Sequence, residues 1–366
     1  MAFDFPATPT PGTIYSPPGG LSYRWDGEKW QLYSAAQYRQ KTALGFNFLI
    51  NPVFNWKQGL TGPYASGYIG DNFAFYRTLS TGVVSSQSLI AKLSPRGSFY
   101  RLRSIVTTPQ AAMSAGHYAI IETYIEGYDL NPLAWGTAQA KPAVLSFGWN
   151  GPAGTYCVAV TNSPINRTFL AAFTVAPGEA NTDVYFSIPI PPPPSGTFRN
   201  DIGIGVIIDF GLACGSTYLG PAGWSTGEFI GITGLQSNGL AAANTFELFD
   251  TGFFADPDNT GLPPVWEPPN ETDDLRRCKR LYETGIVSGF SGNVTSGQPY
   301  TAYGRFEVAK SGNPTLSGTN SLNTSFPATV GTLTNMNDRL TFTETRTANA
   351  TATGLFRSFI TGNARF

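Results

Sequence analysis

The chain has 366 residues, and its 23 basic and 24 acidic side chains give a formal net charge of −1 at pH 7. Charged residues make up 13% of the sequence, about half the ~25% usual in globular proteins, so binding of nucleic acid by neutralising phosphates has little support. Aromatic residues make up 14%, and there are 41 Gly and 28 Pro, a composition that indicates a turn-rich all-β protein.

Residues 1–33 form a small N-terminal module. A Pro-rich, extended run leads into two aromatic segments, Leu21–Trp25 and Trp30–Tyr33. Asp26-Gly27 stands between them, which predicts a hairpin because a type I′ turn needs positive φ angles. The module has too few apolar residues to fold alone, so it either docks on another surface or forms a flexible leader. Residues 34–43 favour a short helical linker, since no helix breaker interrupts them.

Residues 44–284 contain short strands that follow one another at regular intervals. Aromatic and β-branched residues alternate along them, and Gly, Pro, Asn and Asp separate them. This pattern predicts a β-sandwich and not parallel β/α units. The Pro-rich run 189–194 belongs at a sheet edge, because proline cannot donate to a strand ladder. The predicted strands are Tyr100–Val106, Tyr118–Ile125, Ala143–Trp149, Gly154–Val160, Thr168–Val175, Val184–Ile190, Ile202–Phe210, Phe229–Leu235 and Thr245–Phe254.

Residues 271–283 form the one credible amphipathic helix of the sequence. Acidic side chains in its first turn and basic side chains later complement the helix dipole, and we expect these charges to form a solvated face. Its apolar stripe consists of Leu275, Cys278, Leu281 and Tyr282. Residues 285–366 follow as a more polar, Thr-rich β domain. Its core is small, which favours packing between three copies of the chain.

Patterns typical of catalysis are sparse. The sequence has one histidine, His117, and no nucleophile elbow, so a Ser-His-Asp triad has little support. Glu122 and Glu126 share one face of a strand and are the candidates for a glycosidase pair, although a solvated face explains them better. We therefore predict that the chain is not an enzyme.

Metal, cofactor and membrane signals are equally weak. The three cysteines, Cys157, Cys214 and Cys278, are far apart and odd in number, which indicates reduced thiols. Residues 256–261 share the first oxygen ligands of a calcium loop, but an Asp/Pro turn explains them better. We predict no metal and no cofactor. We also expect no secretory signal and no transmembrane helix, since no apolar run approaches ~18 residues.

Sugar binding needs exposed aromatic rings, which stack on the C–H faces of sugars, and amide groups on loops. For any single ring, packing in the core or between subunits is the competing interpretation. The candidates are Tyr128, Trp135, Gln139, Trp149, Tyr218 and Trp224.

Several segments in chain order resemble the fibre or spike proteins of tailed bacteriophages. Residues 18–30 (P-G-G-x-x-Y-x-W-D-G-x-x-W) resemble their N-terminal virion-attachment segment. Phe46–Gln58 and residues 125–147 are similar to the entry strand and the middle of their jelly-roll carbohydrate-binding-like domain. Thr245–Gly252 and the pattern L-x-x-C-x-R-x-Y at residues 275–282 are similar to its closing strand and helix.

The resemblance implies an all-β chain with a virion-attachment segment at 1–33, a helical linker at 34–43, a jelly-roll domain at 44–284 and a C-terminal β domain at 285–366. It implies a homotrimeric tail or head fibre on the virion surface, assembled in the host bacterial cytoplasm, that binds host surface polysaccharide. The first segment would bind tail, portal-vertex or capsid proteins through Phe3, Phe5, Tyr15, Tyr23, Trp25 and Trp30. Two alternatives stay open: a capsid-decorating or adaptor protein that binds no receptor, and a polysaccharide depolymerase.

Overall fold

The computed structural model describes residues 14–15, 22–25, 30–33, 45–60, 65–78, 85–336 and 338–365. Near the N-terminus, β1 (Ile14–Tyr15), β2 (Ser22–Trp25) and β3 (Trp30–Tyr33) form an antiparallel sheet. Trp25 pairs with Trp30 across β2 and β3, so the predicted pairing of these two segments is confirmed. Tyr15 is half-buried, whereas the structure describes only the backbone of Tyr23, Trp25 and Trp30. Phe3, Phe5, Asp26-Gly27 and the linker at 34–43 lie outside the described residues.

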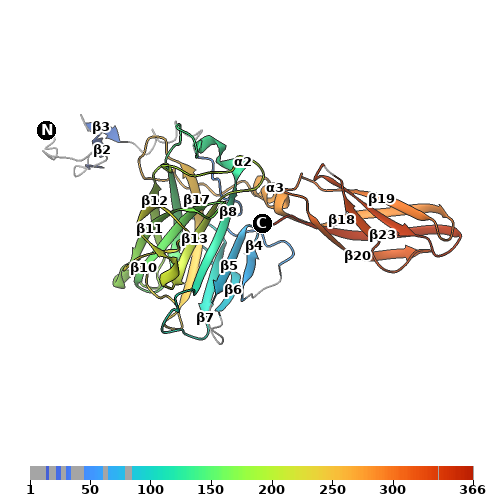
Figure 1. Cartoon of the computed structure of the whole chain (residues 1–366), viewed down its shortest axis with the longest axis horizontal. Coiled ribbons are helices and arrows are strands. Elements are labelled where there is room, and N and C mark those ends of the chain that lie inside the picture. Colours follow the sequence, from blue (N-terminus) through green and yellow to red (C-terminus); the bar gives the residue numbers. More distant parts are fainter. Residues whose placement is uncertain are drawn as a thin grey trace.

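Two antiparallel sheets form the sandwich that dominates the molecule (Figure 1). In the seven-stranded sheet the order is β15 (Gly223–Thr226), β11 (Arg167–Val175), β10 (Gly154–Asn162), β13 (Ile204–Cys214), β8 (Tyr118–Glu126), β5 (Phe73–Thr78) and β4 (Gly67–Gly70). In the five-stranded sheet it is β12 (Val184–Ile190), β9 (Ala143–Asn150), β17 (Thr245–Ala255), β7 (Tyr100–Val106) and β6 (Ser85–Ala91). The chain changes sheets repeatedly, as in a jelly roll.

Short elements connect these strands. They are α2 (Gly127–Leu130), η2 (Asn131–Leu133), η3 (Pro177–Glu179), η4 (Ser216–Tyr218) and the parallel pair β14 (Leu219–Gly220) and β16 (Gly231–Ile232). Ile232 packs on Cys157, Ala159 and Leu170. The segment that contains β14 and β16 therefore covers part of the outer face of the seven-stranded sheet.

Alternation along the strands decides which side chains enter the core. On β8, Ala119, Ile121 and Ile125 are fully buried in the core between the sheets, so the residues between them face outward. On β9, the ring of Phe147 lies 5.0 Å from the ring of Phe210 on the opposite sheet. Aromatic rings packed edge to face in this way add to the stabilisation that comes from burial of their area.

The observed strands confirm most of the sequence prediction. β7 and β12 have the predicted bounds, and β12 is an edge strand, as the Pro-rich run requires. The prediction of a strand over residues 229–235 is wrong except for the two residues of β16, because the chain turns after Ile232 and Gly234 adopts a φ of +78°. The polar strand β6 was not predicted, since Ser and Gln dominate it.

The predicted helix is confirmed as α3 (Glu271–Leu281). The Asn270 side chain caps it by accepting hydrogen bonds from two backbone N–H groups of its first turn, at 3.0 and 3.2 Å. The expectation that its charges form a solvated face is wrong for one side of the helix. Asp274 is 2% exposed and accepts a hydrogen bond from the Asn51 N–H at 2.9 Å. Arg277 and Arg280 also turn toward the sandwich, where each pairs with a carboxylate.

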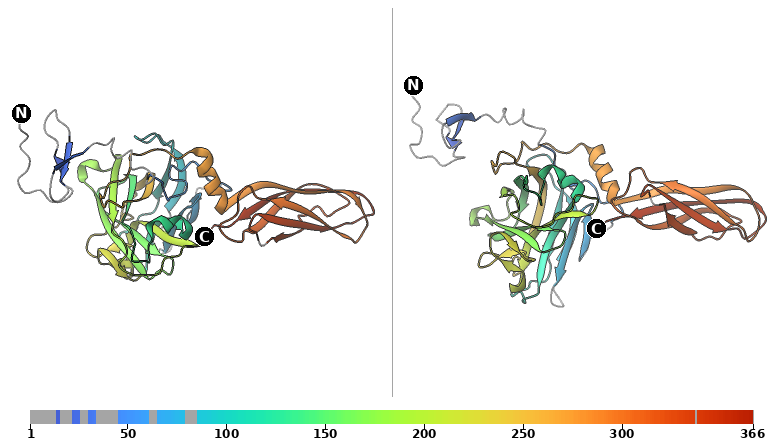
Figure 2. Two further views of the ribbon diagram at one scale, coloured as in Figure 1. Left: turned by 90° about the horizontal axis from the view of Figure 1, so that it is seen from above. Right: turned by 45° about the horizontal axis from the view of Figure 1, so that its top comes forward.

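A second β unit follows α3 and extends away from the sandwich (Figures 1 and 2). It consists of two three-stranded sheets, in the orders β18 (Tyr282–Val294), β23 (Ala352–Asn363), β20 (Thr315–Thr324) and β19 (Pro299–Arg305), β22 (Thr341–Thr347), β21 (Thr332–Asn335). Its apolar residues form two small clusters, one around Phe356 and one around Phe342. Between them, Arg346 and Glu344 form a buried ion pair at 2.8 Å.

Candidate functional site

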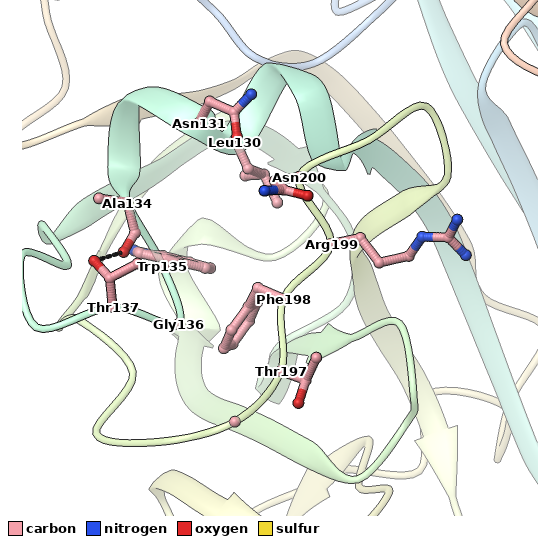
Figure 3. Close-up of a pocket in the computed structure, with 11 residues that line it drawn as sticks. Leu130, Asn131, Ala134, Trp135, Gly136, Thr137, Thr197, Phe198, Arg199 and Asn200 are labelled. Atoms are coloured by element: carbon pink, nitrogen blue, oxygen red, sulfur yellow. Dashed lines mark hydrogen bonds between the residues drawn. The ribbon is translucent and has the colours of Figure 1, made fainter.

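An open cavity of about 400 Å³ lies where two loops of the sandwich meet. One loop follows β8 and contains α2 and η2, and the other joins β12 to β13 (Figure 3). The cavity is lined by Leu130, Asn131, Ala134, Trp135, Gly136, Thr137, Gly196, Thr197, Phe198, Arg199 and Asn200. We refer to it as the loop cavity.

Backbone hydrogen bonds fix the two loops to each other. The Gly127 N–H donates to the Gly203 carbonyl at 2.8 Å, and the Tyr128 N–H donates to the Asp201 carbonyl at 2.7 Å. A Cβ atom on Gly127 would come within 2.4 Å of the Arg199 carbonyl oxygen, so a glycine is needed for this close approach. The cavity is therefore preformed, which keeps the entropy cost of binding low.

Aromatic rings form one wall of the loop cavity. Trp135 is 6% exposed. Its ring packs edge-on against Phe198 at 5.4 Å and against Trp224 at 5.7 Å. The indole N–H of Trp135 donates to the Lys141 carbonyl at 2.7 Å, and that of Trp224 donates to the Pro191 carbonyl at 2.8 Å. Both indoles are thus held in one orientation.

Polar groups form the rest of the lining. Asn131 and Asn200 are exposed, and within the described chain their side-chain amides make no hydrogen bond. Thr137 donates its hydroxyl to the Ala134 carbonyl at 2.7 Å (Figure 3). In the same view Arg199 points away from the two rings. Its guanidinium binds both oxygens of Asp201 at 2.8 Å, and this contact, with the Gly203 N–H, holds the pKa of Asp201 at about 2.

The structure brings together some of the residues proposed for sugar binding. Trp135 lines the loop cavity but belongs to the core cluster, and Trp224 packs against its ring without lining the cavity. Tyr128 is 65% exposed on α2, at the start of the same loop, and Gln139 is exposed further along it without lining the cavity. Neither the sequence spacing nor the composition pointed to Phe198 or Asn200, because a contact between two distant loops creates their position.

Two of the proposed residues lie elsewhere. Trp149 is fully buried in the core, where its ring lies 5.3 Å from that of Phe173. It cannot stack on a ligand from solution, because its place in the alternation of β9 turns it between the sheets. Tyr218 lies in η4 over the outer face of the seven-stranded sheet, with its ring 5.0 Å from that of Tyr118.

The two glutamates considered for catalysis have different surroundings. Glu126 is 2% exposed and binds Arg280 of α3 at 2.6 Å. Burial raises the pKa of Glu126 although the arginine opposes this effect. Glu122 lies four residues earlier on the outer face of β8, accepts a hydrogen bond from the Tyr124 hydroxyl, and lies opposite Asp209 of β13 in the strand register.

The sites considered for metals have ordinary structural roles. Asp256 accepts hydrogen bonds from the Thr260 N–H at 2.9 Å and the Gly261 N–H at 2.6 Å, which is the Asp/Pro turn weighed against a calcium loop. Cys157, Cys214 and Cys278 are free thiols, as predicted. The residues that the structure describes contain no cluster of three His, Cys, Asp or Glu side chains suited to a metal. Within the same residues, no helix has the length and apolar character needed to cross a membrane.

No protein-family model matches the chain, and its sequence matches no curated protein. Partial structural similarity was found to an arabinose-bound MgGH51 α-L-arabinofuranosidase, at 9% identity and a TM-score of 0.32, covering 65% of this chain and 30% of that one. The enzymatically active domain of tailspike protein 4 of bacteriophage CBA120 aligns at 12% identity and a TM-score of 0.28, covering 56% and 23%. The family 11 carbohydrate-binding module of the Clostridium thermocellum cellulase Lic26A-Cel5E aligns at 14% identity and a TM-score of 0.27, covering 50% and 86%. The chain thus spans less than a third of the length of the first two proteins.

Proposed function

We propose that the chain is a homotrimeric receptor-binding fibre of a tailed bacteriophage and that it holds a host surface glycan in the loop cavity. The order of the segments that resemble phage fibre proteins supports the first part. In this proposal residues 1–33 attach the fibre to the particle, and the sandwich presents the cavity to the host.

The observation that carries glycan binding is the meeting of fixed aromatic rings and free amides in one open cavity. Sugars offer apolar C–H faces and hydroxyl groups that both donate and accept hydrogen bonds. The ring of Phe198, supported by the buried ring of Trp135, suits the C–H faces, and the amides of Asn131 and Asn200 suit the hydroxyls. No carboxylate or imidazole is present among the lining residues that the structure describes. The lining therefore favours binding without cleavage.

An array of bacterial surface polysaccharides tests this proposal. We expect the full chain to bind a subset of the array, and we expect Asn200→Ala to weaken that binding about five- to tenfold through the loss of hydrogen bonds. Asn200 is exposed, so the substitution leaves the core intact. Gln298→Ala removes an exposed amide from the second β unit and serves as the matched control. Equal binding of the polysaccharide by Asn200→Ala and by the wild type would mean that the glycan does not bind in the loop cavity.

Two other results would replace the proposal. If no polysaccharide binds but the full chain attaches to phage particles, the protein is a decorating or adaptor component. If a polysaccharide is shortened during incubation, the protein is a depolymerase, and Glu122→Gln and Glu126→Gln would then show whether these carboxyls take part.

A further inference from the structure

A second, smaller cavity lies on the outer face of the seven-stranded sheet, away from the loop cavity. Its volume is about 80 Å³, and we refer to it as the sheet cavity. Strands β5, β8, β10 and β13 and the segment after β15 contribute to it. Its lining consists of Tyr76, Tyr118, Ile120, Glu122, Thr161, Ile165, Ile207, Asp209, Glu228 and Ile230.

The charges around the sheet cavity are all negative. Three of the lining residues carry carboxyl groups, and none of those that the structure describes is Lys, Arg or His. Glu122 and Asp209 are cross-strand neighbours on β8 and β13. Burial raises the pKa of both carboxyls, and the negative charge of each neighbour favours a proton on the pair. Glu228 is exposed at the rim. The remaining ionisable neighbours are Tyr76 from β5 and Tyr118 and Tyr124 from β8.

One buried oxygen of Asp209 supplies a second observation, which concerns this atom and not the charge of the cluster. The residue is 7% exposed, and within the described chain its buried Oδ1 atom has no hydrogen-bond partner. A buried polar atom left without a partner costs free energy, so native structures rarely keep one without a role. A ligand that donates a hydrogen bond inside the cavity would satisfy this atom.

The apolar part of the lining limits the chemistry of that ligand. Ile120, Ile207 and Ile230 are buried around the carboxyl pair, and Ile165 is 43% exposed beside it. The ring of Tyr118, which packs against Tyr218 at 5.0 Å, adds an aromatic surface that attracts cations. A short aliphatic stem that ends in a cation matches this combination of isoleucines, an aromatic ring and carboxyls.

We propose that the sheet cavity binds a protonated primary amine on an aliphatic stem, as in a lysine side chain of a partner protein. The ammonium group donates to Asp209 Oδ1 and to Glu122, and the stem packs on the isoleucines. The arriving positive charge displaces the proton that the two carboxyls share. Binding is therefore accompanied by release of a proton to the solvent.

Calorimetric titration of the full chain tests the proposal with two probes, Nα-acetyl-lysine amide and its uncharged counterpart Nα-acetyl-norleucine amide. We expect only the lysine derivative to bind. Its affinity should be higher at pH 8 than at pH 5, and titrations in buffers of different ionisation enthalpy should show proton release. Equal binding of both probes, or no heat with either, overturns the proposal.

Variants locate the site. Asp209→Asn keeps the shape of the side chain and should weaken binding of the lysine derivative at least about tenfold. Glu228→Gln, at an exposed position that cannot disturb the core, should weaken it by a smaller factor. Asn200→Ala alters only the loop cavity and should leave amine binding unchanged. The amine proposal can therefore be refuted without refuting the glycan proposal, and the reverse also holds. Wild-type affinity in both carboxyl variants contradicts the assignment.

Discussion

Glu122 and Glu126 lie four residues apart on the same face of β8, and their neighbours give them different properties. Glu126 forms an ion pair with Arg280, which balances its charge. Glu122 lies beside Asp209, and no cation among the described residues pairs with it. The strand alternation predicts that they share a face, but it contains no information about which side chains arrive from other elements. The same limit applies to Trp149 and Trp135, because sequence alone identifies both as aromatic and only the packing separates a core ring from a ring at a cavity.

The Glu122–Asp209 pair makes stability depend on pH. Burial raises the pKa of both carboxyls above their usual values, and their mutual interaction raises that of Asp209 further. The folded chain therefore binds more protons than the unfolded chain. The resulting stabilisation is present below the unfolded pKa values, near ~4, and is lost as the pH rises through the raised values.

We therefore expect Asp209→Asn to raise the melting temperature at pH 8, by a few degrees, and to change it little at pH 4. Scanning calorimetry at the two pH values measures the difference. Glu267→Gln, which neutralises an exposed carboxyl, is the control and should have no such pH-dependent effect. An equal shift at both pH values would contradict the raised pKa values.

At the scale of elements, α3 joins the sandwich to the second β unit. Its caps, dipole charges and apolar stripe are local features, and for this reason the helix could be predicted from the sequence. The position of α3 between the sandwich and the second β unit could not be predicted, because the residues that bind Arg277 lie more than 200 residues earlier in the sequence. Arg277 donates to the carbonyls of Asn47 at 3.0 Å, Phe48 at 2.7 Å and Leu49 at 2.9 Å. Strands were predictable for the same local reason, whereas the loops that form the loop cavity were not.

Two adjacent arginines of α3 allow a matched test of this joint. Arg277→Lys removes the planar guanidinium group that donates hydrogen bonds to three backbone carbonyls. We therefore expect a loss of about 2–4 kcal/mol in the free energy of unfolding. Arg276→Lys changes a side chain that is 60% exposed and lies 3.9 Å from Asp273, so we expect a change below about 0.5 kcal/mol. Urea denaturation measures both. Similar losses for the two variants would mean that Arg277 does not hold the joint.

At the scale of the whole molecule, the chain forms an elongated body in which the sandwich and the second β unit lie on opposite sides of α3 (Figures 1 and 2). The end of the chain returns to this joint. Arg365 donates to Asp71 and to the Gln58 carbonyl, both at 2.7 Å, and lies over the ring of Tyr282 at 4.0 Å. The resemblance to phage fibres predicts an order of segments, and the return of the C-terminal strand to the sandwich was not part of that prediction.

The small core of the second β unit is the feature that favours a trimer. Its two clusters contain few fully buried residues for its length, and packing between copies would bury more apolar surface. Light scattering should give three times the mass of the 39.3-kDa chain. A monomeric mass at micromolar concentration would refute the trimer without affecting the cavities.

The most direct measurement compares the full chain with a version that lacks residues 1–33, each incubated with host cells and with phage particles that lack the fibre. We expect both versions to bind cells, Asn200→Ala to reduce that binding, and only the full chain to bind particles. If the full chain binds particles and neither version binds cells, the proposed receptor-binding function is wrong and the protein decorates the particle instead.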